Sequence, residues 1–324
     1  LQRSVGLPAV FLADAMEDSG MFPYFSRGNS LGVYDSGLSN IEYAFTGVAG
    51  EDYLSYRALL EKKGYTLCSQ NAIGNNLFAA YRGEHGLLYT YYAAAMQTVR
   101  IIDDPVSPVE EIADQPQEKL CELSLAQLNL SYPLGSFGMC YVITLEDGRF
   151  VIIDGGYDVM GEDHERLYQY LNLRNVRQDG IVIAAWFLTH EDEDHYTAIH
   201  NFAVDYAGQV TLERFFINTP ATAAWYTSAH LQGDLALYGN VELVVPHTGQ
   251  RFSMGGALFE ILYTDEDWFP REGQNNNECS LVMRMTAGGQ TVRSGAIRER
   301  IITPAQMMKS PATSGRTSAP SSVN

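Results

Sequence analysis

The feature of this sequence that most constrains its fold is an apolar run of eight residues, Ile181–Leu188, which reads IVIAAWFL. A strand with one face in water alternates apolar and polar side chains, whereas a strand covered on both faces is apolar throughout. The run is also far shorter than the ~20 residues that a membrane-spanning helix needs. The sequence therefore predicts a central strand that is buried between two layers of an α/β protein.

Strand-like and helix-like patterns alternate around this run. A hairpin is predicted from residues 140–145 and 149–154, which flank the turn sequence Glu146-Asp147-Gly148. Helices are predicted at residues 164–171, 196–207 and 221–237, and later strands at residues 214–217, 241–245, 258–263 and 280–285. Strands that alternate with helices, together with hairpins, indicate a layered α/β sandwich.

The chain divides into four segments. Residues 1–104 read as a small α+β domain, with a helix at 51–63 and strands at 76–81, 87–92 and 98–102. Residues 105–119 are Pro-rich and acidic and predict a linker. Residues 120–291 form the main domain, and residues 292–324, with five basic side chains and one acidic, predict a disordered or atypical tail.

Candidate catalytic groups are concentrated in the loop after the buried strand, residues 189–195 (THEDEDH). Functional groups collect where the strands of an α/β sheet end, and carboxylates this close together repel one another unless they are solvated or share a cation. Residues two apart in an extended loop point the same way, so His190 and Asp192 can approach one cation, and Asp194 and His195 a second. This donor set suits Zn²⁺, with Mn²⁺ or Fe as alternatives.

Two other interpretations of the loop remain open at this point. Asp and Glu complement the dipole at the start of a helix, so an ordinary acidic helix N-terminus gives the same pattern. A calcium-binding EF-hand loop fits less well, because Asp192 and Asp194 are followed by neither the central Gly nor the terminal Glu of that loop.

Three ordered motifs resemble the metallo-β-lactamase-fold hydrolases. The loop resembles the family signature H-x-H-x-D-H, with Asp192 in the second His position, a form similar to the T-H-x-D-x-D-H of the DNA-uptake channel protein ComEC and its soluble relatives. The turn Asp154-Gly155-Gly156 resembles the turn that follows the opening strands of the family, and residues 277–282 (NECSLV) resemble the N-x-x-S-L-V element of the ComEC-like branch. The resemblance covers about half of the chain.

This resemblance implies a fold and a set of roles. The fold is a four-layer αββα sandwich, here incomplete at its C-terminal end and preceded by the small α+β domain. The metal ligands are His190, Asp192, Asp194 and His195, and Asp194 also orients the attacking water as the catalytic residue. Asp154 is expected to support the metal ligands or to form the turn rather than to bind a metal directly, and Asn277 and Ser280 to be supporting or substrate-side residues.

The C-terminal part of the sequence departs from the family pattern. Family members continue into a strand that ends in Gly-Asp, whose Asp bridges the metals, and then into a loop with a further His ligand. Here Gly289-Gln290-Thr291 is followed by VRSGA, and no histidine occurs after His247. The metal site is therefore expected to be incomplete, or completed from elsewhere. An altered reading frame in the tail is a further hypothesis, which the other frames of the encoding DNA would test.

Two other residues are candidates for the substrate side or second shell of the site. His247 follows a predicted strand, where an ordinary loop histidine is the alternative interpretation. Asp265 follows the end of another strand, where a solvated acidic turn is the alternative.

Composition restricts the partners. A formal net charge of −18 argues against a surface for long nucleic acids, since phosphates are neutralised by clustered Lys and Arg. No apolar stretch predicts a membrane partner. Four scattered cysteines predict free thiols and a reducing cytoplasm, although the sequence begins at Leu1 and leaves secretion open.

The sequence therefore predicts a metal-dependent hydrolase with up to two divalent metals, most simply Zn²⁺. A metal-activated water would act on a phosphoester or a related ester or amide, in a small-molecule substrate. The alternative is a catalytically degenerate module of the same fold with a binding or scaffold role.

Overall fold

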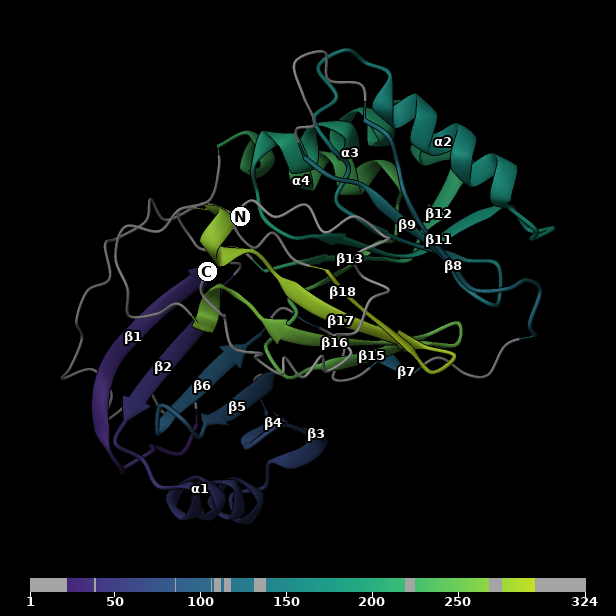
Figure 1. Ribbon diagram of the computed structural model, residues 1–324. Helices are drawn as coiled ribbons and strands as arrows, with labels where there is room; N and C mark the ends of the chain where they lie inside the picture. Colours follow the sequence, from purple (N-terminus) through teal and green to yellow (C-terminus); the bar gives the residue numbers. More distant parts are fainter. Residues whose placement is uncertain are drawn as a thin grey trace, which may run out of the picture.

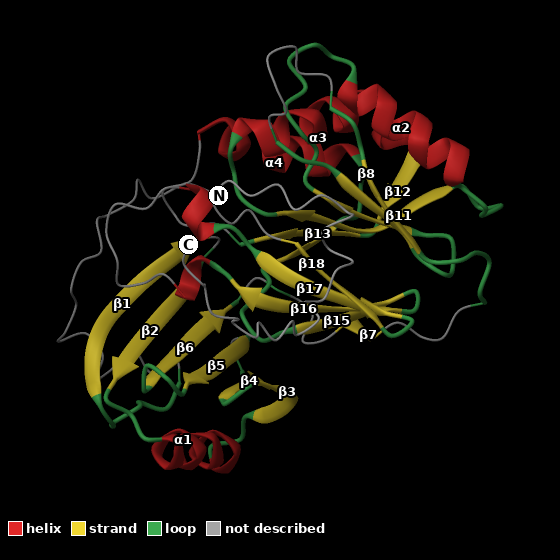
Figure 2. Cartoon of the chain, viewed as in Figure 1, coloured by secondary structure: helices red, strands yellow, loops and turns green. Residues whose placement is uncertain are grey.

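The computed structural model describes residues 22–294 except 38, 85, 106, 108–111, 114–117, 131–137, 219–224 and 268–275. The described strands form three sheets (Figures 1 and 2). The first sheet is antiparallel, in the order β1-β2-β6-β5-β4-β3. Its strands are β1 (Asn29–Gly37), β2 (Asn40–Thr46), β3 (Thr66–Ile73), β4 (Asn76–Arg82), β5 (Leu87–Ala93) and β6 (Thr98–Asp104). Helix α1 (Gly50–Lys62) packs Tyr53, Tyr56 and Leu60 against one face of this sheet.

The second sheet has seven strands and contains the predicted central strand. Its strands are β8 (Ser124–Gln127), β9 (Tyr141–Thr144), β10 (Phe150–Ile153), β11 (Ile181–Leu188), β12 (Val210–Leu212), β13 (Arg214–Ile217) and β14 (Glu242–Val244). The neighbours β10, β11, β13 and β14 run parallel, so their carboxyl ends meet at one edge of the sheet.

The third sheet has five strands and stacks on the second. Its strands are β7 (Ile112–Ala113), β15 (Arg251–Met254), β16 (Ala257–Tyr263), β17 (Val282–Ala287) and β18 (Gln290–Ser294). Side chains of both sheets, among them Phe187 and Phe259, form the core between them, and these two rings stack with their centroids 5.9 Å apart. This pairing of sheets is the inner part of a sandwich.

Helices α2 (Asp163–Arg174), α3 (Glu193–Tyr206) and α4 (Trp225–Leu237) cover the other face of the second sheet (Figure 1). Trp186 of β11 points into this helical core, whereas Phe187 points between the sheets, and every residue of β11 is buried. The prediction of a strand buried on both faces is thus confirmed. The mixed α/β fold class is confirmed too, and it is consistent with an αββα sandwich.

Several predicted elements differ from the structure at their boundaries. The predicted linker contains β7, which pairs in parallel with β15, because two backbone segments there satisfy each other's hydrogen bonds. The predicted tail begins inside β18, which pairs with β17, whereas residues 295–324 lie outside the described residues. The helix predicted from residue 221 begins in the structure at Trp225, and residues 221–224 are not described.

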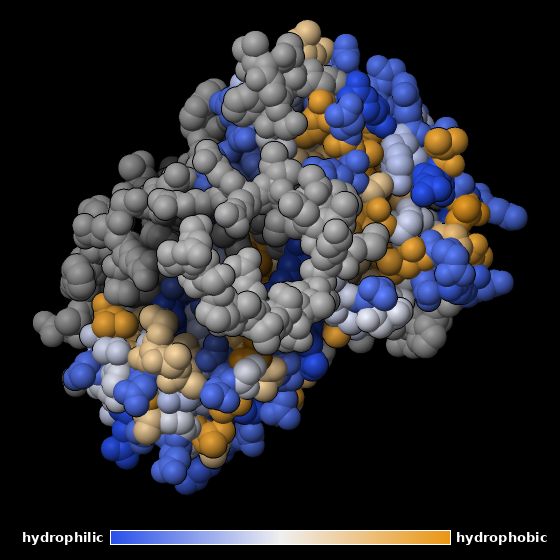
Figure 3. Space-filling view, in the orientation of Figure 1, coloured by the Kyte–Doolittle hydropathy of each residue, from blue (hydrophilic) through white to orange (hydrophobic). Residues whose placement is uncertain are grey.

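The described surface carries no large apolar face on the side drawn in Figure 3, where hydrophilic and hydrophobic residues are interspersed over the described parts. Exposed apolar side chains such as Leu173 and Met160 occur, and single side chains of this kind are normal at a protein surface. Among the described helices, none combines the length and the apolar character that a bilayer crossing requires.

The first sheet contacts the sandwich next to the β14–β15 connection. Asn71 of β3 donates to the carbonyl of Gly249 at 3.0 Å and to the Glu260 carboxylate of β16 at 2.7 Å. Gly249 has φ +93°, and a Cβ at this position would overlap the ring of Phe78. Only glycine therefore lets the connection lie this close to β4.

Replacing Gly249 with alanine is expected to lower the free energy of unfolding by about 2–4 kcal/mol, from left-handed backbone strain and overpacking against Phe78. Urea unfolding measures the loss. Gly74→Ala is the matched control, since Gly74 has φ +61° but open space around it. Equal losses in the two variants would show that Phe78 contributes nothing.

Candidate metal centre

Asp154 joins three elements at the carboxyl edge of the second sheet. It follows β10, is fully buried, and has φ +55°, a conformation that Asp tolerates better than most residues. Its carboxylate accepts hydrogen bonds from the Thr189 N–H at 2.7 Å, the Thr189 hydroxyl at 2.8 Å and His195 Nδ1 at 2.8 Å. One side chain thus holds the end of β11 and the start of α3 in place.

The glycine after Asp154 brings the turn against α3. The N–H of Gly155 donates to the carbonyl of His195 at 2.8 Å. A Cβ on Gly155 would lie 2.9 Å from the backbone N of Ile199, closer than side chains normally approach. The Asp154-Gly155-Gly156 sequence is therefore explained by close approach of the turn to the helix.

His190 is buried beside this turn, with its two ring nitrogens in different surroundings. Nδ1 lies 3.1 Å from the Thr189 hydroxyl and 3.2 Å from the Ser280 hydroxyl. Among the described residues Nε2 has no hydrogen-bond partner, and a carboxylate oxygen of Asp192 lies 3.4 Å from it. A buried polar atom without a partner costs about 1–3 kcal/mol, so this nitrogen is a candidate ligand atom.

His195 lies next to His190, with ring centroids 3.9 Å apart. Its Nδ1 contacts Asp154, and its Nε2 is 3.8 Å from a carboxylate oxygen of Asp194. Burial lowers the pKa of His195, but the carboxylates of Asp154, Asp194 and Asp192 outweigh it and leave the pKa above its usual value. The hydrogen bond from Nδ1 to a carboxylate is the arrangement in which metal-binding histidines are usually oriented.

The third sheet reaches this site through the segment before β17. Asn277, in the 3₁₀ turn Asn276–Cys279, donates from its side chain to Asp192 at 3.1 Å. The N–H of Leu281 donates to the carbonyl of Thr189 at 2.8 Å, which fixes Ser280 beside His190. Both Asn277 and Ser280 thus contact predicted metal ligands.

The predicted donors are two imidazoles and two carboxylates, which are ligands that divalent cations such as Zn²⁺ take. His190 lies beside Asp192 and His195 beside Asp194, and Nε2 of His190 has no hydrogen-bond partner among the described residues. Their arrangement is less complete. Within the described ranges, no three His, Cys, Asp or Glu side chains form a group that could hold a metal ion. Each pair therefore offers at most two of the ligands that a metal ion requires.

The segment that contains this site is similar to known proteins. Residues 134–257 match the family model of the metallo-beta-lactamase superfamily, a range that includes Asp154 and the whole 189–195 loop. That segment, 124 of the 324 residues, is therefore similar to the metallo-beta-lactamase superfamily. The comparison with curated proteins found no match.

Solved structures with the metallo-beta-lactamase fold are also similar to the chain. The protein YhfI from Bacillus subtilis is 16% identical, over 50% of this chain and 55% of its own, with a TM-score of 0.32. A putative metallo-beta-lactamase from Thermotoga maritima is 18% identical, over 53% of this chain and 76% of its own, with a TM-score of 0.32. CmlA from Streptomyces venezuelae, a diiron beta-hydroxylase, is 15% identical, over 56% of this chain and 30% of its own, with a TM-score of 0.31. The chain thus spans little more than half the length of YhfI.

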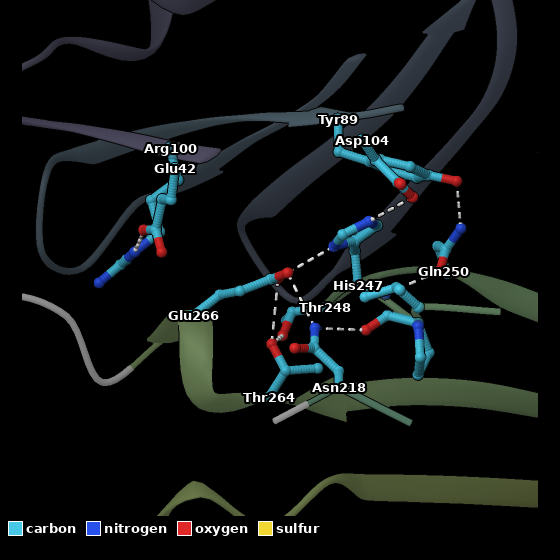
Figure 4. A network of polar contacts seen from close by, with 12 residues as sticks. Glu42, Tyr89, Arg100, Asp104, Asn218, His247, Thr248, Gln250, Thr264 and Glu266 are labelled. Atoms are coloured by element: carbon cyan, nitrogen blue, oxygen red, sulfur yellow. Dashed lines mark hydrogen bonds and ion pairs between the residues drawn. The ribbon is translucent and has the colours of Figure 1, made fainter. Parts of the chain in front are cut away.

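Two further predicted site residues, His247 and Asp265, have other neighbours. Both ring nitrogens of His247 are engaged, Nδ1 with Glu266 and Nε2 with Asp104 of β6 at 3.1 Å (Figure 4). Asp265 begins the 3₁₀ turn Asp265–Asp267, where it is fully buried rather than solvated. Burial and the carboxylates of Glu266 and Asp267 raise the pKa of Asp265. His247 thus joins β6 of the first sheet to the sandwich, and Asp265 lies in the same turn as Glu266, the partner of His247.

The sequence analysis assigned no role to three residues that contact the predicted site residues or their partners in the structure, namely Thr189, Asn218 and Glu266. Thr189 contacts both Asp154 and His190. Asn218, which follows β13, donates to Glu266 at 2.9 Å and to the carbonyl of Pro246 at 2.8 Å (Figure 4). A polar residue directly after a strand of a parallel sheet is the one signal that could have identified Thr189 and Asn218. Glu266 carries no such signal.

Proposed function

We propose that this chain is a metal-dependent hydrolase whose 189–195 loop holds up to two divalent cations. The observation that carries the proposal is the buried Nε2 of His190, which lacks a hydrogen-bond partner and faces Asp192 beside the ring of His195. A cation ligand is the partner that this nitrogen lacks, since a metal-bound imidazole uses the lone pair that no proton donor occupies here.

In this proposal His190 and Asp192 hold the first cation, and Asp194 with His195 the second. Asp194 also orients the attacking water. Its side chain is 34% exposed and can therefore contact solvent. A bound divalent cation would supply a Lewis acid that lowers the pKa of water and stabilises developing negative charge. The imidazoles and carboxylates favour Zn²⁺, with Mn²⁺ or Fe as alternatives.

The proposed substrate is a small phosphoester or a related ester or amide. The T-H-x-D-x-D-H form of the loop, similar to the ComEC-like branch, favours phosphodiester chemistry. The net charge of −18 favours small substrates over long nucleic acids.

The four cysteines are free thiols, Cys140 and Cys279 buried and Cys68 and Cys121 half-buried, which supports our proposal of a cytoplasmic enzyme.

Metal analysis tests the proposal directly. The purified protein is expected to retain about two equivalents of transition metal, and the His190→Ala/Asp194→Ala variant to lose metal and activity on a generic phosphodiester together, because each cation loses a ligand. The control His230→Ala/Asp179→Ala removes the same residue types outside the site and should retain both. Equal metal content in the two double variants would contradict the assignment.

The second candidate is a catalytically degenerate module with a binding or scaffold role. The observation that favours it is that no group of three ligands forms among the described residues. A folded wild-type protein that holds no metal above background, even after incubation with Zn²⁺, would support this alternative over the enzyme.

A further inference from the structure

We propose that Ser280 and Thr189 together hold His190 in the tautomer that carries its proton on Nδ1, so that Nε2 presents a lone pair. Ser280 is then a positioning residue that acts on the metal site from the third sheet. The inference rests on the proposed function only in its consequence for metal affinity. The tautomer itself is a property of the metal-free protein.

The hydroxyl proton of Thr189 is committed to another acceptor. Its Oγ1 lies 2.8 Å from the carboxylate of Asp154, which can only accept. The same oxygen lies 3.1 Å from Nδ1 of His190. Toward His190, the Thr189 hydroxyl therefore offers a lone pair.

The hydroxyl proton of Ser280 is committed in the same way. Its Oγ donates to the backbone carbonyl of Asn277 at 2.8 Å, and a carbonyl can only accept. The Ser280 Oγ lies 3.2 Å from Nδ1 of His190 and is also left with a lone pair on that side.

Two acceptors therefore face one ring nitrogen, and Nδ1 satisfies both only by donating. A neutral imidazole carries one proton, so Nε2 must then be the acceptor. Nε2 is buried and has no hydrogen-bond partner among the described residues. The carboxylate oxygen of Asp192, 3.4 Å away, favours a proton on Nε2 in the metal-free protein, so the assignment requires that the two hydroxyls at Nδ1 outweigh this single carboxylate. A proton on Nδ1 thus selects the nitrogen that points at the candidate cation position.

The backbone keeps Ser280 in this position. The N–H of Leu281 donates to the carbonyl of Thr189 at 2.8 Å, which joins the start of β17 to the end of β11. Ser280 is 2% exposed, so water does not compete for its hydroxyl. Thr189 follows β11 of the second sheet and Ser280 precedes β17 of the third, so the stacking of the two sheets brings both hydroxyls to one imidazole.

The tautomer can be read in the metal-free protein from long-range ¹H–¹⁵N spectra of ¹⁵N-histidine, recorded above the usual pKa of imidazole. Wild-type His190 is expected to show the Nδ1–H pattern, and the Ser280→Ala/Thr189→Val variant a mixture with Nε2–H. A wild-type His190 protonated on Nε2 would overturn the proposal.

Zn²⁺ affinity, measured by competition with a chelating dye, tests the positioning role. Ser280→Ala is expected to bind Zn²⁺ about 10-fold more weakly, within the range known for residues that orient metal ligands. Ser280→Thr should restore the affinity, since it keeps the hydroxyl. Ser253→Ala, an exposed hydroxyl on the same sheet, is the matched control. Equal affinity in Ser280→Ala and Ser253→Ala would remove the positioning role.

These two readouts separate this inference from the proposed function. An Nδ1–H tautomer in a protein that takes up no Zn²⁺ would support the tautomer assignment and contradict the enzyme. Zn²⁺ binding by a wild-type protein with His190 protonated on Nε2 in the metal-free state would do the reverse.

Discussion

Replacing His247 with alanine is expected to lower the free energy of unfolding by about 3–5 kcal/mol, the range found when one partner of a buried ion pair is removed. His247 is fully buried between Glu266 and Asp104 (Figure 4). Without the imidazole, both carboxylates lose their shared partner between the first sheet and the sandwich. Urea unfolding measures the loss, and His230→Ala, at a half-buried histidine of α4, is the control.

The pH dependence of stability identifies His247 as the cause. Burial lowers the pKa of His247, but Glu266 and Asp104 outweigh burial and raise it from 6.5 to about 10. A group with a raised pKa in the folded state stabilises fully below its unfolded pKa, and the contribution disappears as pH rises through the folded value. The wild type should therefore lose stability between pH 6.5 and about 10, and His247→Ala should lose less. Parallel pH profiles would contradict the ion pair.

The surroundings of His247 explain why a large effect is expected. Glu42 and Arg100 form a second buried ion pair at 2.7 Å, and Asp267 contacts the Tyr91 hydroxyl at 2.6 Å. Burial raises the pKa of Glu42 more than Arg100 lowers it. The contact between the first sheet and the sandwich contains more buried acidic side chains than basic ones. The positive charge on His247 therefore reduces repulsion among the carboxylates and also pairs with Glu266 and Asp104.

Replacing Asp154 with alanine is expected to weaken Zn²⁺ binding about 10–100-fold and to lower the free energy of unfolding by about 2–4 kcal/mol. The variant leaves the N–H of Thr189 without its acceptor, frees His195 to rotate, and places alanine at φ +55°. Dye competition measures the affinity, and urea unfolding measures the stability.

A matched control separates the two effects. Asp158 is also a buried aspartate, and it accepts hydrogen bonds from the backbone N–H groups of Glu162 and Asp163 and from Asn201. Asp158→Ala should therefore lose comparable stability without losing Zn²⁺ affinity. If Asp158→Ala weakens Zn²⁺ binding as much as Asp154→Ala does, the loss reflects general destabilisation and Asp154 has no specific role.

The predictions made from local patterns succeeded where a short stretch of chain decides its own structure. Ile181–Leu188 is a buried strand with the predicted bounds, and the loop after it enters α3 at Glu193. Strands β1, β2 and β3 were not predicted. Burial alternates only weakly along β3, and the place of β2 in the sheet depends on pairing with β6, which lies much later in the chain.

The candidate site, too, was predicted from the sequence only in part. The sequence by itself determined that imidazoles and carboxylates gather after the central strand, since apolar periodicity and residue spacing are local properties. Only the tertiary structure decided which groups contact them. Asp154 meets Thr189 across 35 positions, Ser280 meets His190 across 90, and Asp104 meets His247 across 143. The physical reason is that a hydrogen bond requires two atoms at one point in space, and only the stacking of the sheets brings residues so far apart in the chain together.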